Sequence, residues 1–471
     1  MDVLLSGLRI ERAGHGSMAA QLARQIRAAI HEGRLAAGEK LPPSRDLGAQ
    51  LGLGRNTVVQ AYEQLAAEGW LVGMGRRGTR VAESRPAPSA ETPKLIRRLT
   101  QPMSAQVAPA FDWRLGQAAA VPLPLEVWRA ATREAGRSLP PNGYGDPGGD
   151  ATLRDAIAGW LAQHRRLHVS PEQVVVTQGA SQAIELIAQL LLRPGDACCV
   201  ENPGYVRAAQ AFARHGGQVR PVPIDADGMD VREAFAGARK PALVHVTAAH
   251  HYPLGVRMPG ARRRELLALA ARHGAVVIEN EYDHEFVHAG PNHAPLFASA
   301  PQQVLLVSTF AKAISPSMRL GFVVAEPGIA GRLAELVARD KQHVSWPVQR
   351  SVAWLIRRGE LDRHLRRVRR HTAQLRALVV EQLSARDTPL RFAGEDGGLH
   401  LVLRMRSARD TARLAEALRA RGVALELLDD FKLAKTPDHG ILMAYGHMGE
   451  ADALTACATL REAVAACAAR R

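Results

Sequence analysis

Lys312 is the residue whose setting most clearly indicates covalent chemistry. It follows an apolar run at residues 304–307, which is predicted to be a buried strand. A lysine placed just after such a strand can form a Schiff base with an aldehyde cofactor. Thr309 and Arg319 lie close by in the sequence and supply the hydroxyl and guanidinium groups that a cofactor phosphate requires. A single lysine on a loop is usually solvated, so this prediction depends on support from other segments.

A glycine turn gives the first support. Gly179, Ala180 and Ser181 end the predicted strand at residues 174–177 and open a helix. A glycine turn at a helix N-terminus is a natural seat for phosphate, although such turns are common in any α/β domain.

Polar residues follow two further predicted strands. Tyr205 could stack on a ring or simply pack within its loop. At residues 279–283 the alternation of side chains along a strand places Asn280 and Tyr282 on one face and Glu281 on the other. Which of Asn280 and Glu281 would face a bound ring stays open at this stage.

Two adjacent histidines raise the question of a metal site. His250 and His251 follow another predicted strand, but no carboxylate or third histidine stands at ligand spacing. No metal site is predicted.

These segments belong to a large C-terminal region. From residue 111 to residue 471, short apolar strands alternate with amphipathic helices, which predicts a parallel sheet covered on both faces. Residues 83–110 are predicted to be a linker because prolines interrupt them without apolar periodicity. Residues 1–82 form a separate region of short helices followed by a glycine-rich hairpin.

The N-terminal region has the pattern of a DNA-binding head. Leu22, Ile26 and Ile30 mark the buried face of a first helix; Ser44 is predicted to cap a second. A third helix, at about residues 55–68, carries polar side chains at its N-terminus, where a recognition helix enters the major groove. The hairpin at residues 73–79 is a plausible wing. A small structural bundle with solvated arginines is the alternative.

Bulk properties set broad limits. The 471 residues carry a net charge of +15, which favours an anionic partner only weakly, because arginines also serve as ordinary surface residues. No signal-peptide core or membrane-spanning run is apparent, so a soluble, cytoplasmic protein is expected.

The ordered motifs of the head resemble the GntR family of winged-helix regulators across about residues 15–82. The matching run is LPPSRDLGAQLGLGRNTVVQAYEQLAAEGWL, followed by the glycine wing. Family members often carry a basic residue where Val59 stands. The resemblance implies double-stranded operator DNA as a partner and, as contacts, Arg45, Arg55, Asn56 and Thr57, followed by Gln60 and Arg76.

The body resembles fold-type-I aminotransferases, and the whole chain resembles the MocR subfamily, which fuses a GntR head to that fold. The implied fold class is α/β: a winged helix-turn-helix plus an aminotransferase-like domain that binds pyridoxal 5'-phosphate (PLP), with a smaller C-terminal α+β subdomain. The resemblance also implies a homodimer. The implied cofactor residues are Lys312 as the Schiff-base lysine, Arg319, Ala180, Ser181 and Thr309 around the phosphate, Tyr205 and Tyr282 on the ring, Asn280 opposite its nitrogen, and Tyr144 reaching the partner's phosphate.

Three positions depart from the family pattern: Ala311 replaces a serine, Leu254 a threonine, and Asn280 the acid that normally pairs with the pyridine nitrogen. The last change favours cofactor binding over full transaminase chemistry.

The leading hypothesis is therefore a PLP-dependent transcription regulator that senses an amine, an amino acid or PLP itself. Arg207 is a candidate for binding a carboxylate of the effector, or is an ordinary surface arginine. A working aminotransferase with a DNA-binding head is the second hypothesis. The third is a DNA-binding protein whose body only dimerises and holds no cofactor.

Overall fold

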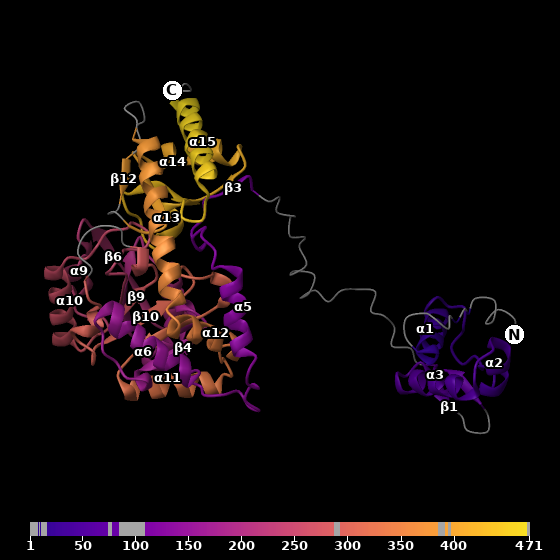
Figure 1. Cartoon of the computed structure of the whole chain (residues 1–471). Helices are drawn as coiled ribbons and strands as arrows, with labels where there is room; N and C mark the ends of the chain where they lie inside the picture. Colours follow the sequence, from indigo (N-terminus) through magenta and orange to yellow (C-terminus); the bar gives the residue numbers. More distant parts are fainter. Residues whose placement is uncertain are drawn as a thin grey trace. The chain divides into compact units, whose positions relative to one another are not determined.

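The computed structural model describes residues 8, 10, 17–73, 78–83, 109–286, 293–384, 391–393 and 397–468. The chain divides into two compact units, residues 1–106 and 107–471, here called the head and the body and described separately (Figure 1). Among the described residues, no helix is long and apolar enough to cross a membrane.

The head consists of three helices and a two-stranded hairpin: α1 (Met18–His31), α2 (Ser44–Leu51), α3 (Arg55–Ala67), β1 (Leu71–Gly73) and β2 (Thr79–Val81). Its core joins the predicted stripe of α1 to Val58 and Leu65 of α3. Ser44 does not cap α2 as predicted: it is the first helical residue, and Pro43 occupies the cap position. The strands of the hairpin pair in antiparallel register, from Leu71 opposite Val81 to Gly73 opposite Thr79.

The body is built on an eight-stranded sheet in the order β4-β11-β10-β9-β8-β5-β6-β7. The strands are β4 (Val174–Thr177), β5 (Ala197–Asn202), β6 (Gln218–Asp225), β7 (Gly228–Met229), β8 (Leu243–Val246), β9 (Val276–Glu281), β10 (Val304–Thr309) and β11 (Gly321–Val324). The sheet is mixed rather than wholly parallel, because β11 runs antiparallel to β10 and β4, and β7 antiparallel to β6. The connection from β10 to β11 is too short for a crossover helix, so the chain turns back beside the strand it has left.

Helices cover both faces of this sheet (Figure 1). One face, called the α7 face, packs against α7 (Ala180–Leu191), α8 (Val206–Arg214) and α11 (Pro327–Arg339). The opposite α6 face packs against α5 (Leu125–Ala135), α6 (Ala151–Arg165), α9 (Val231–Ala234), α10 (Gly260–His273) and α12 (Trp346–Arg357). Successive residues of each strand therefore enter different cores, as Leu305 and Leu306 of β10 do.

A smaller α+β subdomain completes the body. The long helix α13 (Glu360–Leu383) begins in the core of the α6 face and ends in the core of this subdomain. Its antiparallel sheet has the order β12 (Arg391–Ala393), β13 (His400–Met405), β16 (His439–Ala444) and β15 (Glu426–Leu427), and packs with α14 (Ala408–Arg419) and α15 (Glu450–Ala468). The pair β3 (Phe111–Asp112) and β14 (Val423–Ala424) joins the start of the body to this subdomain.

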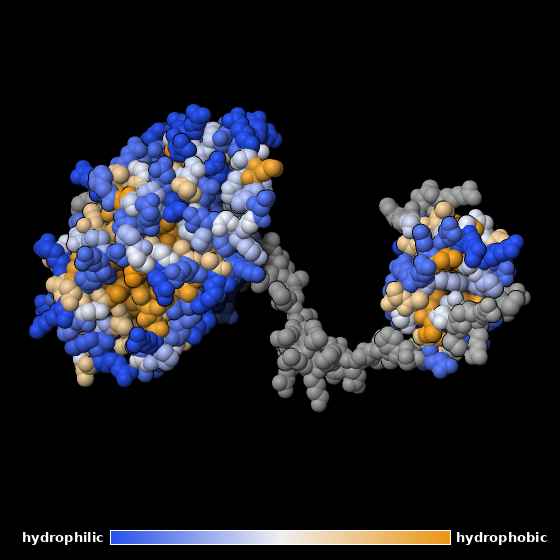
Figure 2. All heavy atoms as spheres, turned by 90° about the horizontal axis from the view of Figure 1, so that it is seen from below, coloured by the Kyte–Doolittle hydropathy of each residue, from blue (hydrophilic) through white to orange (hydrophobic). Residues whose placement is uncertain are grey.

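The body also exposes apolar surface. Hydrophobic side chains gather across the middle of the face that Figure 2 shows, with hydrophilic ones around them. Among the described residues, Leu125, Leu139 and Tyr144 are large apolar side chains with 57%, 91% and 66% of their surface exposed. Contiguous exposed apolar surface on a folded domain commonly marks an interaction site.

A buried ion pair anchors β9 to α6. The Arg165 guanidinium donates to both carboxylate oxygens of Glu281, one of them at 2.6 Å, and both side chains are 2% exposed. Breaking such a pair strands a charge in a low-dielectric interior, which is far costlier than losing a surface pair.

Arg165→Met should lower the free energy of unfolding of the body by about 3–5 kcal/mol, because Glu281 stays buried without its bidentate partner. The matched control is Arg332→Met, which removes an exposed partner of Glu335 and should cost about 1 kcal/mol or less. Urea unfolding of both variants measures the difference, and equal shifts would contradict the role assigned to the buried pair.

Candidate functional sites

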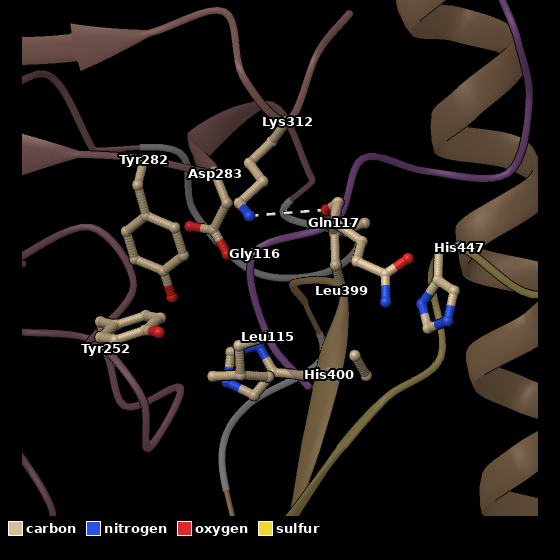
Figure 3. Close-up of a pocket in the computed structure, with 11 residues that line it drawn as sticks. Leu115, Gly116, Gln117, Tyr252, Tyr282, Asp283, Lys312, Leu399, His400 and His447 are labelled. Carbon is tan, nitrogen blue, oxygen red and sulfur yellow. Dashed lines mark hydrogen bonds between the residues drawn. The ribbon is translucent and has the colours of Figure 1, made fainter. Parts of the chain in front are cut away.

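The side chain of Lys312 lines a pocket that lies between the strand ends of the large sheet and the small subdomain (Figure 3). Its Nζ atom lies 3.5 Å from the backbone oxygen of Gln117. Burial lowers the pKa of Lys312 to about 8, so the amine is much easier to deprotonate than a surface lysine. The lining residues are Leu115, Gly116, Gln117, Tyr252, Tyr282, Asp283, Lys312, Leu399, His400, Ala444 and His447.

Two residues of the pocket wall, Tyr282 and Asp283, share His250 as a hydrogen-bond partner. The His250 Nδ1 atom lies 2.7 Å from Asp283 Oδ2 and 3.1 Å from the hydroxyl of Tyr282. His251 points elsewhere, and its Nδ1 atom accepts a hydrogen bond from the backbone N–H of Leu254. The two histidines thus have separate partners. Among the described residues, no group of three or more His, Cys, Asp and Glu side chains is arranged to hold a metal.

Several lining residues escaped the sequence analysis. Gln117 precedes the first helix of the body, whereas His400 begins β13 and His447 follows β16. These segments are far apart in the chain, and none carries a motif that marks it as functional. Only the packing of the small subdomain against the large sheet brings them to Lys312.

A second group of predicted residues lies on the α7 face. Tyr205 and Ser181 share a hydrogen bond of 2.9 Å between their hydroxyls. The Tyr205 ring lies nearly parallel to that of His245, at 6.0 Å between ring centres, and His245 contacts Asn280. Tyr252, which also contacts Tyr205 and Tyr282, connects this group to the Lys312 pocket.

The predicted phosphate seat is narrow. At Gly321, an added Cβ atom would come within 2.8 Å of the Cα atom of Gly179, and Gly179 has a φ of +89° that favours glycine. Thr309 lies beside them, with its hydroxyl donating to the backbone oxygen of Leu320 at 3.2 Å. Ala180 begins α7, whose N-terminus lacks a side-chain cap and leaves N–H groups for an anion.

Other predicted residues are not among those that line the Lys312 pocket. Arg319 and Arg207 are exposed, and Arg207 lies on the first turn of α8. Tyr144 is exposed too. Its ring stacks on the ring of His343 and lies near the ammonium group of Lys341. Leu254, in place of the family threonine, is 2% exposed and packs in an apolar cluster, so it serves the core.

The residues present fit PLP in kind. Lys312 offers a half-buried amine. The closely spaced Gly179 and Gly321, beside the start of α7, suit a phosphate. Asn280 Oδ1 and His245 Nδ1 are buried polar atoms without a hydrogen-bond partner among the described residues. Unpaired polar atoms inside a protein are costly, so these two atoms would suit the polar atoms of a bound ligand.

The head presents its predicted DNA contacts on the expected helices. Arg45 on α2 and Arg55, Asn56 and Gln60 on α3 are exposed, whereas Thr57 is half-buried. Arg76, the predicted contact in the wing, lies outside the described residues.

Two protein families match separate parts of the chain. Residues 18–81 match "Bacterial regulatory proteins, gntR family", and residues 114–438 match "Aminotransferase class I and II". The probable rhizopine catabolism regulatory protein MocR of Rhizobium meliloti is 30% identical over 93% of this chain and 92% of that protein. The chain belongs to the MocR subfamily of GntR-type transcriptional regulators. In this MocR-type regulator, a winged helix-turn-helix is joined to an aminotransferase-like body, which confirms the predicted fold class.

Other relatives agree with this assignment. The pyridoxine biosynthesis transcriptional regulator PdxR of Corynebacterium glutamicum is 33% identical over 92% of this chain and 93% of that protein. The α-aminoadipate aminotransferase LysN of Thermus thermophilus, solved with N-(5'-phosphopyridoxyl)-L-leucine, has a TM-score of 0.70 at 23% identity, covering 80% of this chain and 95% of that one. The kynurenine aminotransferase of Pyrococcus horikoshii has a TM-score of 0.68 at 22% identity, with the same coverage. These two structures establish the fold of the body.

Arg55→Ala should weaken binding to a DNA fragment selected by the unaltered MocR-type regulator by about 1–3 kcal/mol, because Arg55 begins α3, the expected recognition helix. Arg34→Ala is the matched control, since Arg34 follows α1 and pairs with Glu32. Fluorescence anisotropy at physiological salt measures both, and unchanged affinity of Arg55→Ala would refute its assignment as a base contact.

Proposed function

We propose that this regulator binds PLP at Lys312 and senses an amine, an amino acid or PLP itself there, and that ligand binding changes how the head binds operator DNA. The observation that carries the proposal is the setting of Lys312. Its amine has a lowered pKa and lines a pocket beside the carboxyl ends of β9 and β10.

When bound, PLP supplies an aldehyde that joins the lysine nitrogen and a ring that withdraws electrons. Lys312 would hold the aldehyde carbon, and Tyr282 the phenolic oxygen. Ser181, Thr309, Arg319 and the first N–H groups of α7 would hold the phosphate. Tyr205 would cover the ring, and Asn280 would face its nitrogen.

Asn280 favours sensing over catalysis. A carboxylate opposite the ring nitrogen would keep a proton there, whereas an amide carries no charge to stabilise that proton. On the α6 face, Glu281 is engaged by Arg165, so it does not replace the missing acid in this arrangement. Exchange of amines at the lysine needs less electron withdrawal than transamination does.

A working aminotransferase is the second candidate, because most of the body matches the class I and II family. Turnover of amino donors with a keto acid distinguishes it from a sensor.

We also propose a homodimer. Tyr144 is exposed in its own chain and would reach the phosphate site of a second copy, and Leu125 and Leu139 add exposed apolar surface nearby in the sequence. Two heads would then bind repeated half-sites in operator DNA.

Arg207 is proposed to bind an anionic group of the effector. Burial raises the pKa of Tyr252, and the charge of Arg207 acts on the same hydroxyl in the opposite direction. Arg207 therefore lies close enough to influence a residue of the pocket wall.

Lys312→Ala should abolish the covalent attachment of PLP, because it removes the amine that the aldehyde joins. Borohydride reduction followed by peptide mass mapping measures the attachment. Lys435→Ala is the control, since Lys435 is exposed and should leave labelling unchanged. Labelling that persists in Lys312→Ala would refute the assignment, and an unaltered protein without labelling would favour a body that only dimerises.

Asn280→Asp should accelerate single-turnover transamination, because a carboxylate can stabilise a protonated ring nitrogen. The barrier should fall by on the order of 2–4 kcal/mol, the range expected for a preorganised electrostatic contact. Rapid-mixing absorbance with amino donors follows the reaction. If the unaltered protein already reacts at ordinary enzyme rates, Asn280 does not limit the chemistry and the sensing proposal loses its basis.

A further inference from the structure

His245 and Asn280 form a buried polar pair on neighbouring strands of the large sheet. His245 lies on β8 with none of its surface exposed, and Asn280 lies on β9 with 3% exposed. The Asn280 Nδ2 atom is 3.4 Å from His245 Nε2, a long hydrogen bond. This is the hydrogen bond that the structure gives to the Asn280 side chain, and the amide oxygen remains unpaired.

Strand alternation places this pair on the cofactor side of the sheet. Leu243 and Ile278, two residues before His245 and Asn280 on their strands, both belong to the core of the α7 face. The ring of Tyr205 lies nearly parallel to that of His245. The pair thus lies on the side of the sheet that carries Tyr205 and the start of α7.

The carboxylates of β9 lie on the other side. Glu281 pairs with Arg165, and Glu279 accepts from the backbone N–H of Phe297 and lies 3.8 Å from Arg263. Asp283 follows the strand and is engaged by His250. None of these carboxylates contacts the amide of Asn280.

The ionisable member of the pair is itself neutral at pH 7, because burial lowers the pKa of His245 to about 4. A positive charge placed beside this pair would lack a counter-charge, and burying an unpaired charge is strongly unfavourable.

We propose that His245 is a positioning residue: it accepts from one N–H of the Asn280 amide and so leaves the second N–H to donate to the ring nitrogen of bound PLP, and this neutral pair keeps that nitrogen unprotonated. The inference rests on the proposed function, because it requires PLP at Lys312. It goes beyond it by assigning to His245 a role that none of the sequence motifs indicates, and by stating the protonation state that the pair imposes.

The test is the ¹⁵N chemical shift of PLP labelled at its ring nitrogen, measured by NMR in the loaded full-length protein. The unaltered protein should give the shift of an unprotonated pyridine at pH 7, and Asn280→Asp that of a protonated one. Loading is measured separately, by absorbance and mass. An unaltered protein that fails to load PLP refutes the proposed function, whereas one that loads PLP with a protonated ring refutes this inference alone.

The positioning role of His245 is tested by a double-mutant cycle on PLP affinity. His245→Leu and Asn280→Ala should each weaken binding about fivefold, the value of one hydrogen bond between neutral groups. The double variant should bind PLP no more than about fivefold more weakly than the unaltered protein, because the second change removes a contact already lost.

His245→Gln should restore affinity and the ¹⁵N shift, since its amide can also hydrogen-bond Asn280. The exposed His168→Leu is the control. A double variant weakened about 25-fold would show independent effects and refute the pair.

Discussion

The site depends on one geometric constraint, the alternation of side chains along β9. Because successive residues of a strand point to opposite faces, Glu279 and Glu281 enter the α6 face while Asn280 enters the α7 face. Arg165 then stabilises the arrangement, since turning Glu281 inward would break a bidentate buried ion pair. On the proposed function, the sheet itself therefore decides that β9 presents an uncharged amide, and no carboxylate, to the cofactor site.

This neutrality fits a regulator better than an enzyme. A half-buried amine with a lowered pKa would keep Lys312 reactive toward an aldehyde, while the Asn280–His245 pair provides no charge to promote carbanion chemistry. On the proposed function, the fold shared with the solved aminotransferases would retain reversible covalent binding and lose turnover. In a protein whose N-terminal unit matches GntR regulators, such binding would act as a signal.

The sequence predicted those features that depend on a local pattern of residues. The spacing of apolar residues and the run from Leu41 to Leu71 predicted the head, and the strand–turn motifs predicted Lys312, Gly179, Tyr205 and Asn280 as candidates. The mixed sheet was missed, because the direction of β11 depends on a short connection rather than on its own residues. Ser44 was misassigned as a cap because Pro43 already sets the entry to α2.

By itself, then, the sequence determined the fold class, the two-part organisation and the residues at the strand ends, since these follow from periodicity and contiguous motifs. Only the tertiary structure decided which of them meet. Gln117, His400 and His447 join the Lys312 pocket from segments without a motif. The partners of Glu281 and Asn280, Arg165 and His245, lie on other elements of the body. Contacts between distant segments arise from the packing of whole faces, and the local pattern of a strand does not contain them.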